Sequence, residues 1–150
     1  MTDHIWIQIR EVFVDRLTGL DVTIGTETVV PDVQTELVHE PNPDDLPLYA
    51  VYWNAESILD RTRDDIRRAP QFVVECWYAG ADVTDWLAEM ASVAQASIEA
   101  DRNLGGVVMK CHYDGAEQSL SGEGRKRSGV IRLNFVCEVI TAHGNPGLRA

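Results

Sequence analysis

Residues 72–106 decide the fold, and they read FVVECWYAGADVTDWLAEMASVAQASIEADRNLGG. The first seven are mostly β-branched and aromatic, which is typical of a strand. Apolar side chains then recur at helical spacing, so a helix is predicted over residues 82–101, with Asp82 or Thr84 as its cap. Two glycines at 105–106 end this helix, because glycine tolerates a positive φ. The stretch therefore predicts a compact unit of sheet and helix.

The C-terminal part extends this unit with two more strands. Residues 107–113 are predicted as one strand, and residues 114–129 as a polar, glycine-rich loop that is mobile until a partner docks. Residues 130–141 are predicted as the last strand, and residues 142–150 as a frayed tail. One face of the last strand is apolar throughout, with Ile131, Leu133, Phe135, Cys137 and Val139. This alternation indicates that one face of the strand lies on the core.

The N-terminal part predicts a second helix and more strands. Apolar spacing indicates a helix over residues 4–17, capped by Asp3. Residues 20–46 contain several prolines and are expected to form an irregular arm or loose hairpin. Residues 48–53 favour a strand, and the charged residues 56–68 either extend a hairpin or form a short helix.

Length and composition predict one α+β domain over residues 1–150. Its sheet is expected to be mixed, mostly antiparallel and of four to five strands, with two main helices packed on it. Hydrophobic residues make up 45% of the chain, which favours a globular protein over a disordered one. No apolar run approaches the roughly 20 residues of a membrane span. The first residues lack a basic region followed by an apolar stretch, so we expect no signal peptide and cytoplasmic synthesis.

The net charge of −11 is unevenly distributed. Residues 17–60 contain nine acidic residues and no basic one, which gives this stretch a charge of −9. It is either a solvated segment that aids solubility, or a face that repels nucleic acid or pairs with a basic patch. Binding along DNA phosphates is disfavoured, because it requires a clustered positive surface. The candidate contact residues are Asp44 and Asp45 on the acidic side, and Arg61, Arg63, Arg67, Arg68, Arg125, Lys126 and Arg127 on the basic side.

Motifs for catalysis or metal binding are not found in the sequence. Cys76, Cys111 and Cys137 all fall in predicted strands and are expected to be reduced and buried. Cys111 and His112 are adjacent, so on a strand they point to opposite faces, and no zinc-site spacing supports a metal. Nucleophile motifs and phosphate-binding loops are absent as well. We therefore expect no metal, disulfide or cofactor, and a protein that is not an enzyme.

The order of elements resembles one known family. An amphipathic helix and a variable arm come first, and a series of short motifs follows. These are LPLYAVY at 46–52, RRAPQFVVE at 67–75, D-x-x-x-W-L at 82–87, IEADRNLGG at 98–106 and FVCEV at 135–139. Over residues 5–140 this pattern resembles the tail terminator proteins of long-tailed phages, also called minor tail protein U.

The resemblance implies a structural protein of a phage or prophage, located in the virion tail and assembled in the host cytoplasm. Its subunits would form a ring, expected to be a hexamer, that caps the tail tube, stops its polymerisation and offers a surface for head attachment. The implied partners are other copies of the chain, the tail tube protein and a head–tail connector protein. DNA would pass through the ring without specific binding, and no cofactor or membrane is implied.

A head-to-tail ring requires two different, complementary patches on each subunit. The acidic stretch 17–60 and the basic clusters 61–68 and 125–127 are the candidates, with Trp53 and Trp77 as apolar contacts. Two alternatives remain. One is another neck or connector protein of the virion, which its binding partner would distinguish. The other is a cellular ligand-binding or enzymatic α+β domain, which a pocket with convergent polar groups would favour.

Overall fold

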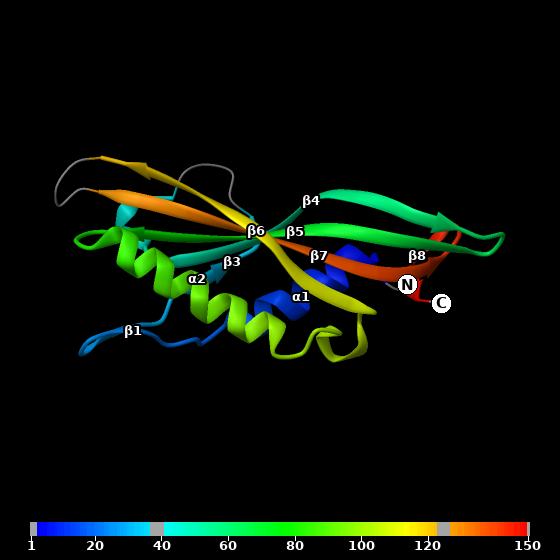
Figure 1. The fold of residues 1–150 in the computed structure, drawn as a ribbon, viewed down its shortest axis with the longest axis horizontal. Helices are drawn as coiled ribbons and strands as arrows, with labels where there is room; N and C mark the ends of the chain where they lie inside the picture. Colours follow the sequence, from blue (N-terminus) through cyan, green and yellow to red (C-terminus); the bar gives the residue numbers. More distant parts are fainter. Residues whose placement is uncertain (1–2, 37–40, 123–126, 150) are drawn as a thin grey trace.

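A computed structural model describes residues 3–36, 41–122 and 127–149, and these residues form one main sheet with two helices (Figure 1). The helices are α1 (Ile5–Leu17) and α2 (Val83–Glu99), and short 3-10 turns are η1 (Pro43–Asp45) and η2 (Leu104–Gly106). The strands are β1 (Val22–Ile24), β2 (Glu27–Val29), β3 (Asp32–Gln34), β4 (Leu48–Arg61), β5 (Asp65–Ala79), β6 (Lys110–Ser121), β7 (Ser128–Ala142) and β8 (Asn145–Arg149).

The main sheet has the order β3-β4-β5-β7-β6, and β8 adds to β7. Neighbouring strands are antiparallel except for β3, which runs parallel to β4. Strands β1 and β2 form a separate small hairpin. The predicted α+β class and mixed, mostly antiparallel sheet are therefore confirmed. The described residues place six strands in this sheet, more than the four to five expected.

Both helices pack on the same face of the main sheet. That face presents alternate residues of the long strands, such as Phe72 and Val74 of β5 and Phe135 of β7. Apolar side chains of both helices pack against these strand residues. The buried helix residues are Ile5, Ile9, Phe13 and Leu17 of α1, and Val83, Trp86, Leu87, Met90, Ala94 and Ile98 of α2. We call this side the helix face of the sheet and the opposite side the far face.

The two helices begin differently from the prediction. The imidazole Nδ1 of His4 accepts the N–H of Trp6 at 3.1 Å, so His4 and not Asp3 caps α1. Asp82 precedes α2 with a left-handed φ of 57° and makes no capping bond through its side chain. Its carbonyl still accepts the N–H of Trp86 at 3.1 Å. The backbone conformation of Asp82 thus starts this helix without the predicted side-chain cap.

In the predicted loop 114–129, the described residues 114–121 and 128–129 are strand and not loop. Strand β6 continues to Ser121 and β7 begins at Ser128, and the two pair along their length. The prediction is wrong here because most of β6 beyond Asp114 is exposed on both faces. Polar residues therefore occur on both faces, and the alternation that marks a half-buried strand is lost. Arg125 and Lys126 lie outside the described residues.

Other segments are also more regular than predicted. Residues 142–150 do not simply fray, because β8 pairs with the end of β7. The strand expected at 107–113 starts only at Lys110. The arm at 20–46 contains the β1–β2 hairpin and β3, and residues 56–68 form a hairpin and not a helix. In the tail, the arm and the hairpin, backbone pairing with a neighbouring strand overrides a local composition that is poor in β-forming residues, whereas Val107 and Val108 remain outside the sheet despite their β propensity.

The β4–β5 hairpin and the paired strands β6 and β7 project in opposite directions (Figure 1). Near one end of β5, Ile66 pairs with Arg61 across the β4–β5 turn, and at the other end Ala79 pairs with Ser128 at the start of β7. The chain exposes 8229 Å². A compact monomer of 16.7 kDa is expected to expose about 7,600 Å². The chain therefore exposes somewhat more surface than a compact monomer of its mass.

Candidate interaction surface

The tip of the β4–β5 hairpin carries two of the predicted basic residues. Arg61 ends β4 and Arg63 lies in the turn, and both are exposed. The turn is closed by the N–H of Thr62, which donates to the carbonyl of Asp65 at 2.9 Å. His143 Nε2 lies 2.8 Å from the carbonyl oxygen of Thr62 and so ties the tip to the β7–β8 turn. The two arginines are thus presented on a supported end of the sheet.

Arg68 is held within the chain at the root of this hairpin. Its guanidinium lies 3.1 Å from a carboxylate oxygen of Glu56, and both side chains are mostly buried. Trp6 Nε1 donates to the other oxygen of Glu56 at 2.8 Å, and Arg68 Nε donates to Thr141 Oγ1 at 2.8 Å. This network connects α1 with β4, β5 and β7, so Arg68 serves the subunit's own structure.

Arg67 points to the other face, because successive residues of a strand alternate. Its guanidinium donates to Glu138 Oε2 at 3.0 Å, and Lys110 Nζ lies 3.7 Å from the same oxygen. The hydrogen bond from Arg67 lowers the pKa of Glu138 below its ordinary value. Arg67 and Arg68, adjacent in the sequence, therefore do not form one basic patch.

A buried carboxylate organises the far face. Glu75 is only 6% exposed, and it accepts three hydrogen bonds, from Tyr52 Oη at 2.8 Å, Trp77 Nε1 at 2.9 Å and Arg132 Nε at 2.9 Å. The register places Ala50, Glu75, Arg132 and Glu117 in one row across β4, β5, β7 and β6. This row forms a polar ladder across the sheet on the side away from the helices.

The two candidate tryptophans lie on opposite faces. Trp53 is half-buried on the helix face, 5.6 Å from Trp6 between ring centroids, with the guanidinium carbon of Arg10 5.2 Å from its own ring centroid. Trp77 is buried on the far face in a small cluster with Leu48, Ala50 and Val130, against which Leu46 packs. Both tryptophans make contacts within the subunit, and they lie on opposite faces of the sheet and not together.

The predicted acidic candidates lie on exposed segments. Asp44 and Asp45 form the exposed turn η1, where the side chain of Asn42 accepts the N–H of Asp44. Arg127, just before β7, is exposed too, and its carbonyl accepts the N–H of Gly80 at 2.9 Å. Arg61, Arg63 and Arg127 are therefore the described basic candidates with exposed side chains and no carboxylate within ion-pair distance in the described part of the chain.

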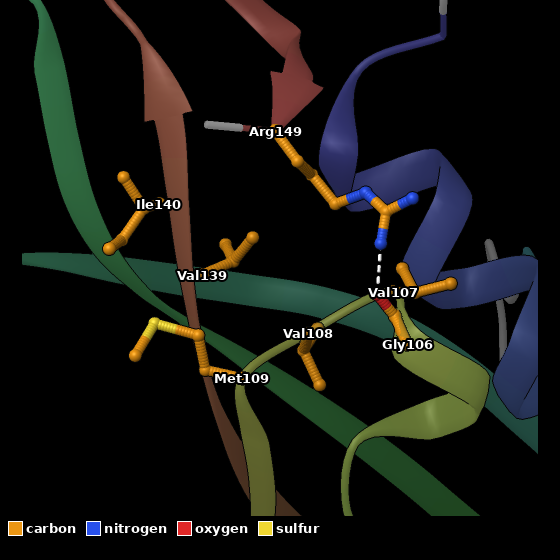
Figure 2. Close-up of a pocket in the computed structure, with 7 residues that line it drawn as sticks. All are labelled: Gly106, Val107, Val108, Met109, Val139, Ile140 and Arg149. Atoms are coloured by element: carbon orange, nitrogen blue, oxygen red, sulfur yellow. Dashed lines mark hydrogen bonds between the residues drawn. The ribbon is translucent and has the colours of Figure 1, made fainter.

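Two shallow hollows lie next to Ile140 of β7, which lines both. Figure 2 shows the first, of about 150 Å³, lined mainly by the apolar residues Val107, Val108, Met109, Val139 and Ile140. The guanidinium of Arg149 lies at its rim and donates to the carbonyl of Gly106. The second, of about 210 Å³, lies between the hairpin tip and β7 and is lined by Asp60, Thr62, Asp65, Arg67 and Ile140. Neither encloses a set of convergent polar groups around a deep cavity.

The three cysteines are buried, as expected, and carry free thiols. Cys111 and Cys137 face each other across β6 and β7, and the contact with Cys111, together with burial, raises the pKa of the Cys137 thiol. Among residues 3–36, 41–122 and 127–149, no three histidine, cysteine or carboxylate side chains gather as a metal site would require.

Comparison with protein-family models and with curated proteins finds no match to this chain. In the part of the chain that the structure describes, neither helix is long and apolar enough to cross a membrane.

Tyr52 is half-buried on the far face, so stability at alkaline pH tests its hydrogen bond to Glu75. Burial, and then the hydrogen bond to Glu75, raises the pKa of Tyr52 to about 12. Because the pKa is higher in the folded state, the stabilising effect of the neutral phenol is complete below about pH 10 and is lost as the pH rises towards 12. We expect urea unfolding to show a steeper loss of stability over this range for the wild type than for Tyr52→Phe. Equal pH dependence of the two proteins would contradict this role.

Proposed function

We propose that the chain is a ring-forming virion assembly protein that caps a phage tail tube, ends its polymerisation and offers a surface to the head. The observation that carries this proposal is the pair of strand hairpins that project from opposite ends of one sheet. Such ends present two different surfaces, and a closed ring requires each subunit to contribute two different, complementary surfaces. In this proposal the protein is not an enzyme and works through contacts alone.

Three further features support the proposal. The order of motifs over residues 5–140 resembles tail terminator proteins. Apolar side chains are exposed on the projecting strands, with Ile58 39%, Leu59 47% and Leu120 40% exposed. The acidic residues of β2, β3 and η1 and the basic tip of the β4–β5 hairpin are both exposed, so charge can guide one copy onto the next. Partners under this proposal are other copies of the chain, the tail tube and a head-side connector.

The decisive experiment is native mass spectrometry of the purified protein, with negative-stain images, in the absence and presence of tail tubes. We expect a closed ring, a hexamer by the family resemblance, and rings at the ends of the tubes. A protein that stays monomeric or dimeric even with tubes present would overturn the proposal. Binding to a head-side connector with no affinity for tail tubes would favour another neck protein of the virion instead.

Reversing the charge of the hairpin tip should weaken assembly moderately. We expect Arg61→Glu with Arg63→Glu to raise the concentration needed for half-assembly about fivefold at low salt, because two exposed ion pairs together contribute about 1 kcal/mol. The effect should shrink at high salt, where exposed charges are screened. Sedimentation at both salt concentrations measures this.

The matched control keeps the charge and changes only the shape of the head group. The variant Arg61→Lys with Arg63→Lys should assemble like the wild type. If the glutamate variant assembles normally and the wild type is insensitive to salt, the proposed charge pairing at this tip is wrong. The ring can still form through apolar and backbone contacts.

A further inference from the structure

Within the described residues, the main sheet has an unpaired edge on each side. Strand β6 is last in the order, and residues 116–121 are exposed. On the other side β3 pairs only with Leu48 to Ala50 of β4, so no described strand pairs with the outer side of β4 beyond them. We call residues 52–61 the β4 edge and residues 113–121 the β6 edge.

The hydrogen bonds show which backbone groups of the β6 edge point outward. Met109 N–H donates to the carbonyl of Glu138 at 2.8 Å, so the backbone of Glu138 is directed to the β6 side. Backbone direction alternates along a strand, so the odd-numbered residues of β7 are directed to β5. Gln118 pairs with Ile131, one of these, and therefore directs its own N–H and C=O away from β7. The same reasoning applies to Ala116 and Leu120.

The β4 edge is exposed in the same way. Gly80 N–H donates to the carbonyl of Arg127, so even-numbered residues of β5 are directed to β7. Ile58 of β4 pairs with Arg68, an even-numbered residue, and therefore directs its N–H and C=O outward. Each edge thus presents backbone donors and acceptors that can pair with another chain, in regular alternation over residues 55–58 of β4 and 115–121 of β6, between the register shifts of these strands.

The two edges match in direction and length. Because β4, β5, β7 and β6 alternate in direction, a copy rotated about an axis along the strands brings its β4 antiparallel to the first copy's β6. The edges have nearly equal length, about 30 Å at 3.4 Å per residue. Gln118, Leu120 and Ile58 lie on the helix face, so joining the edges keeps all helices on one side of the combined sheet.

The offset between the edges fits a closed ring. The centre of the β6 edge, Glu117, lies in the row of Glu75, whereas Ser57, near the centre of the β4 edge, lies in the row of Ala69. Aligning the two centres shifts each copy by about 20 Å along the strands relative to its neighbour. Across the strands, each copy adds four strands at about 4.8 Å spacing, which span about 20 Å. Strands with that stagger tilt by about 45° from the ring axis, close to the 35–45° of closed barrels.

We propose that the β4 edge of one copy pairs antiparallel with the β6 edge of the next, so that one sheet runs through the whole ring. This inference depends on the proposed self-assembly and names the contact that makes it. The occupant of each edge is a second copy of the chain, and the pairing is heterologous, between different edges. Backbone bonds supply the register, and Ile58, which lies opposite Ala116 when the centres align, supplies apolar contact at the seam.

Proline substitution tests the backbone pairing directly. Gln118→Pro and Ile58→Pro each remove one outward N–H and leave the bonds to β7 and β5 in place, because those come from neighbouring residues. We expect each variant to keep its far-ultraviolet circular dichroism and to need at least about tenfold more protein for half-assembly. Gln118→Ala and Ile58→Ala retain the N–H and are the matched controls, expected to stay within about twofold of wild type.

Cross-linking tests the partners even if a proline variant fails to fold. Gln118→Cys and Ile58→Cys are prepared separately and treated with a short bis-maleimide, alone and mixed. The native cysteines are buried and should not react. We expect cross-linked dimers from the mixture and none from either variant alone. Dimers from Gln118→Cys alone would show β6 paired with β6 and overturn the proposal.

The outcomes separate this inference from the proposed function. If wild-type rings form, but the proline variants assemble normally or the mixture gives no cross-link, the edge pairing is wrong and the ring function stands. If the wild-type protein does not self-associate under any condition tested, the proposed function is wrong and the edge pairing is wrong with it.

Discussion

Phe135→Ala is expected to cost about 3–5 kcal/mol of folding free energy, the largest effect predicted for a single substitution in this chain. Phe135 is fully buried at the centre of β7. Its ring lies 5.5 Å from Phe13 of α1 and 5.9 Å from Tyr113 of β6, measured between centroids, in edge-on arrangements. Truncation leaves a cavity between helix and sheet and removes both aromatic contacts, so the loss exceeds the transfer free energy of the ring alone.

Urea unfolding followed by circular dichroism measures this loss, and the melting temperature should fall by roughly 10 °C. The neighbouring residue supplies the control, since Val136 points to the far face and is only half-buried. We expect Val136→Ala to cost about 1 kcal/mol or less. A cost below about 1 kcal/mol for Phe135→Ala would mean that α1 does not rest on the sheet as described.

The sequence predicts those elements whose two faces differ. Along residues 130–141 apolar and polar side chains alternate, and the apolar set lies against the helices, as predicted. In α1 and α2 the apolar stripe does the same. In these segments burial of one face is itself the reason for the pattern, so the pattern reports the structure.

The same reasoning explains the segments that were predicted wrongly. The outer part of β6, predicted as a loop, and the end of the β4–β5 hairpin, predicted either as a hairpin or as a short helix, expose both faces and so lack alternation. They are strands because a neighbour supplies backbone hydrogen bonds, and that neighbour is distant in the sequence. Single-sequence patterns carry little information on such pairing.

The candidate surface was predictable only in part. The cluster of arginines at 61–68 lies at and beside the β4–β5 turn, at one end of the sheet. Sequence proximity could not show that Arg67 and Arg68 lie on opposite faces and pair with Glu138 and Glu56. The unpaired edges depend on the order of strands in the sheet, in which β7 comes between β5 and β6, and no local motif encodes that order.

Glu75→Ala is expected to be the second most damaging change, at about 2–3 kcal/mol. The carboxylate of Glu75 is the common acceptor for Tyr52, Trp77 and Arg132. Its removal leaves the indole N–H of Trp77 buried without its partner and separates the guanidinium of Arg132 from its counter-charge. The cost stays below that of a fully buried ion pair, because Arg132 is partly exposed and water can solvate it.

The row across the sheet offers a matched control and a test of coupling. Glu117 lies on the other side of Arg132 in the same row but is exposed, so Glu117→Ala should change the free energy of unfolding by about 0.5 kcal/mol or less. A double-mutant cycle of Glu75→Ala with Arg132→Ala should give a coupling energy of about 1 kcal/mol or more, because the two side chains share one hydrogen-bonded network. Additive effects of the two substitutions would show that Glu75 stabilises the far face through packing alone and not as the acceptor that joins three strands.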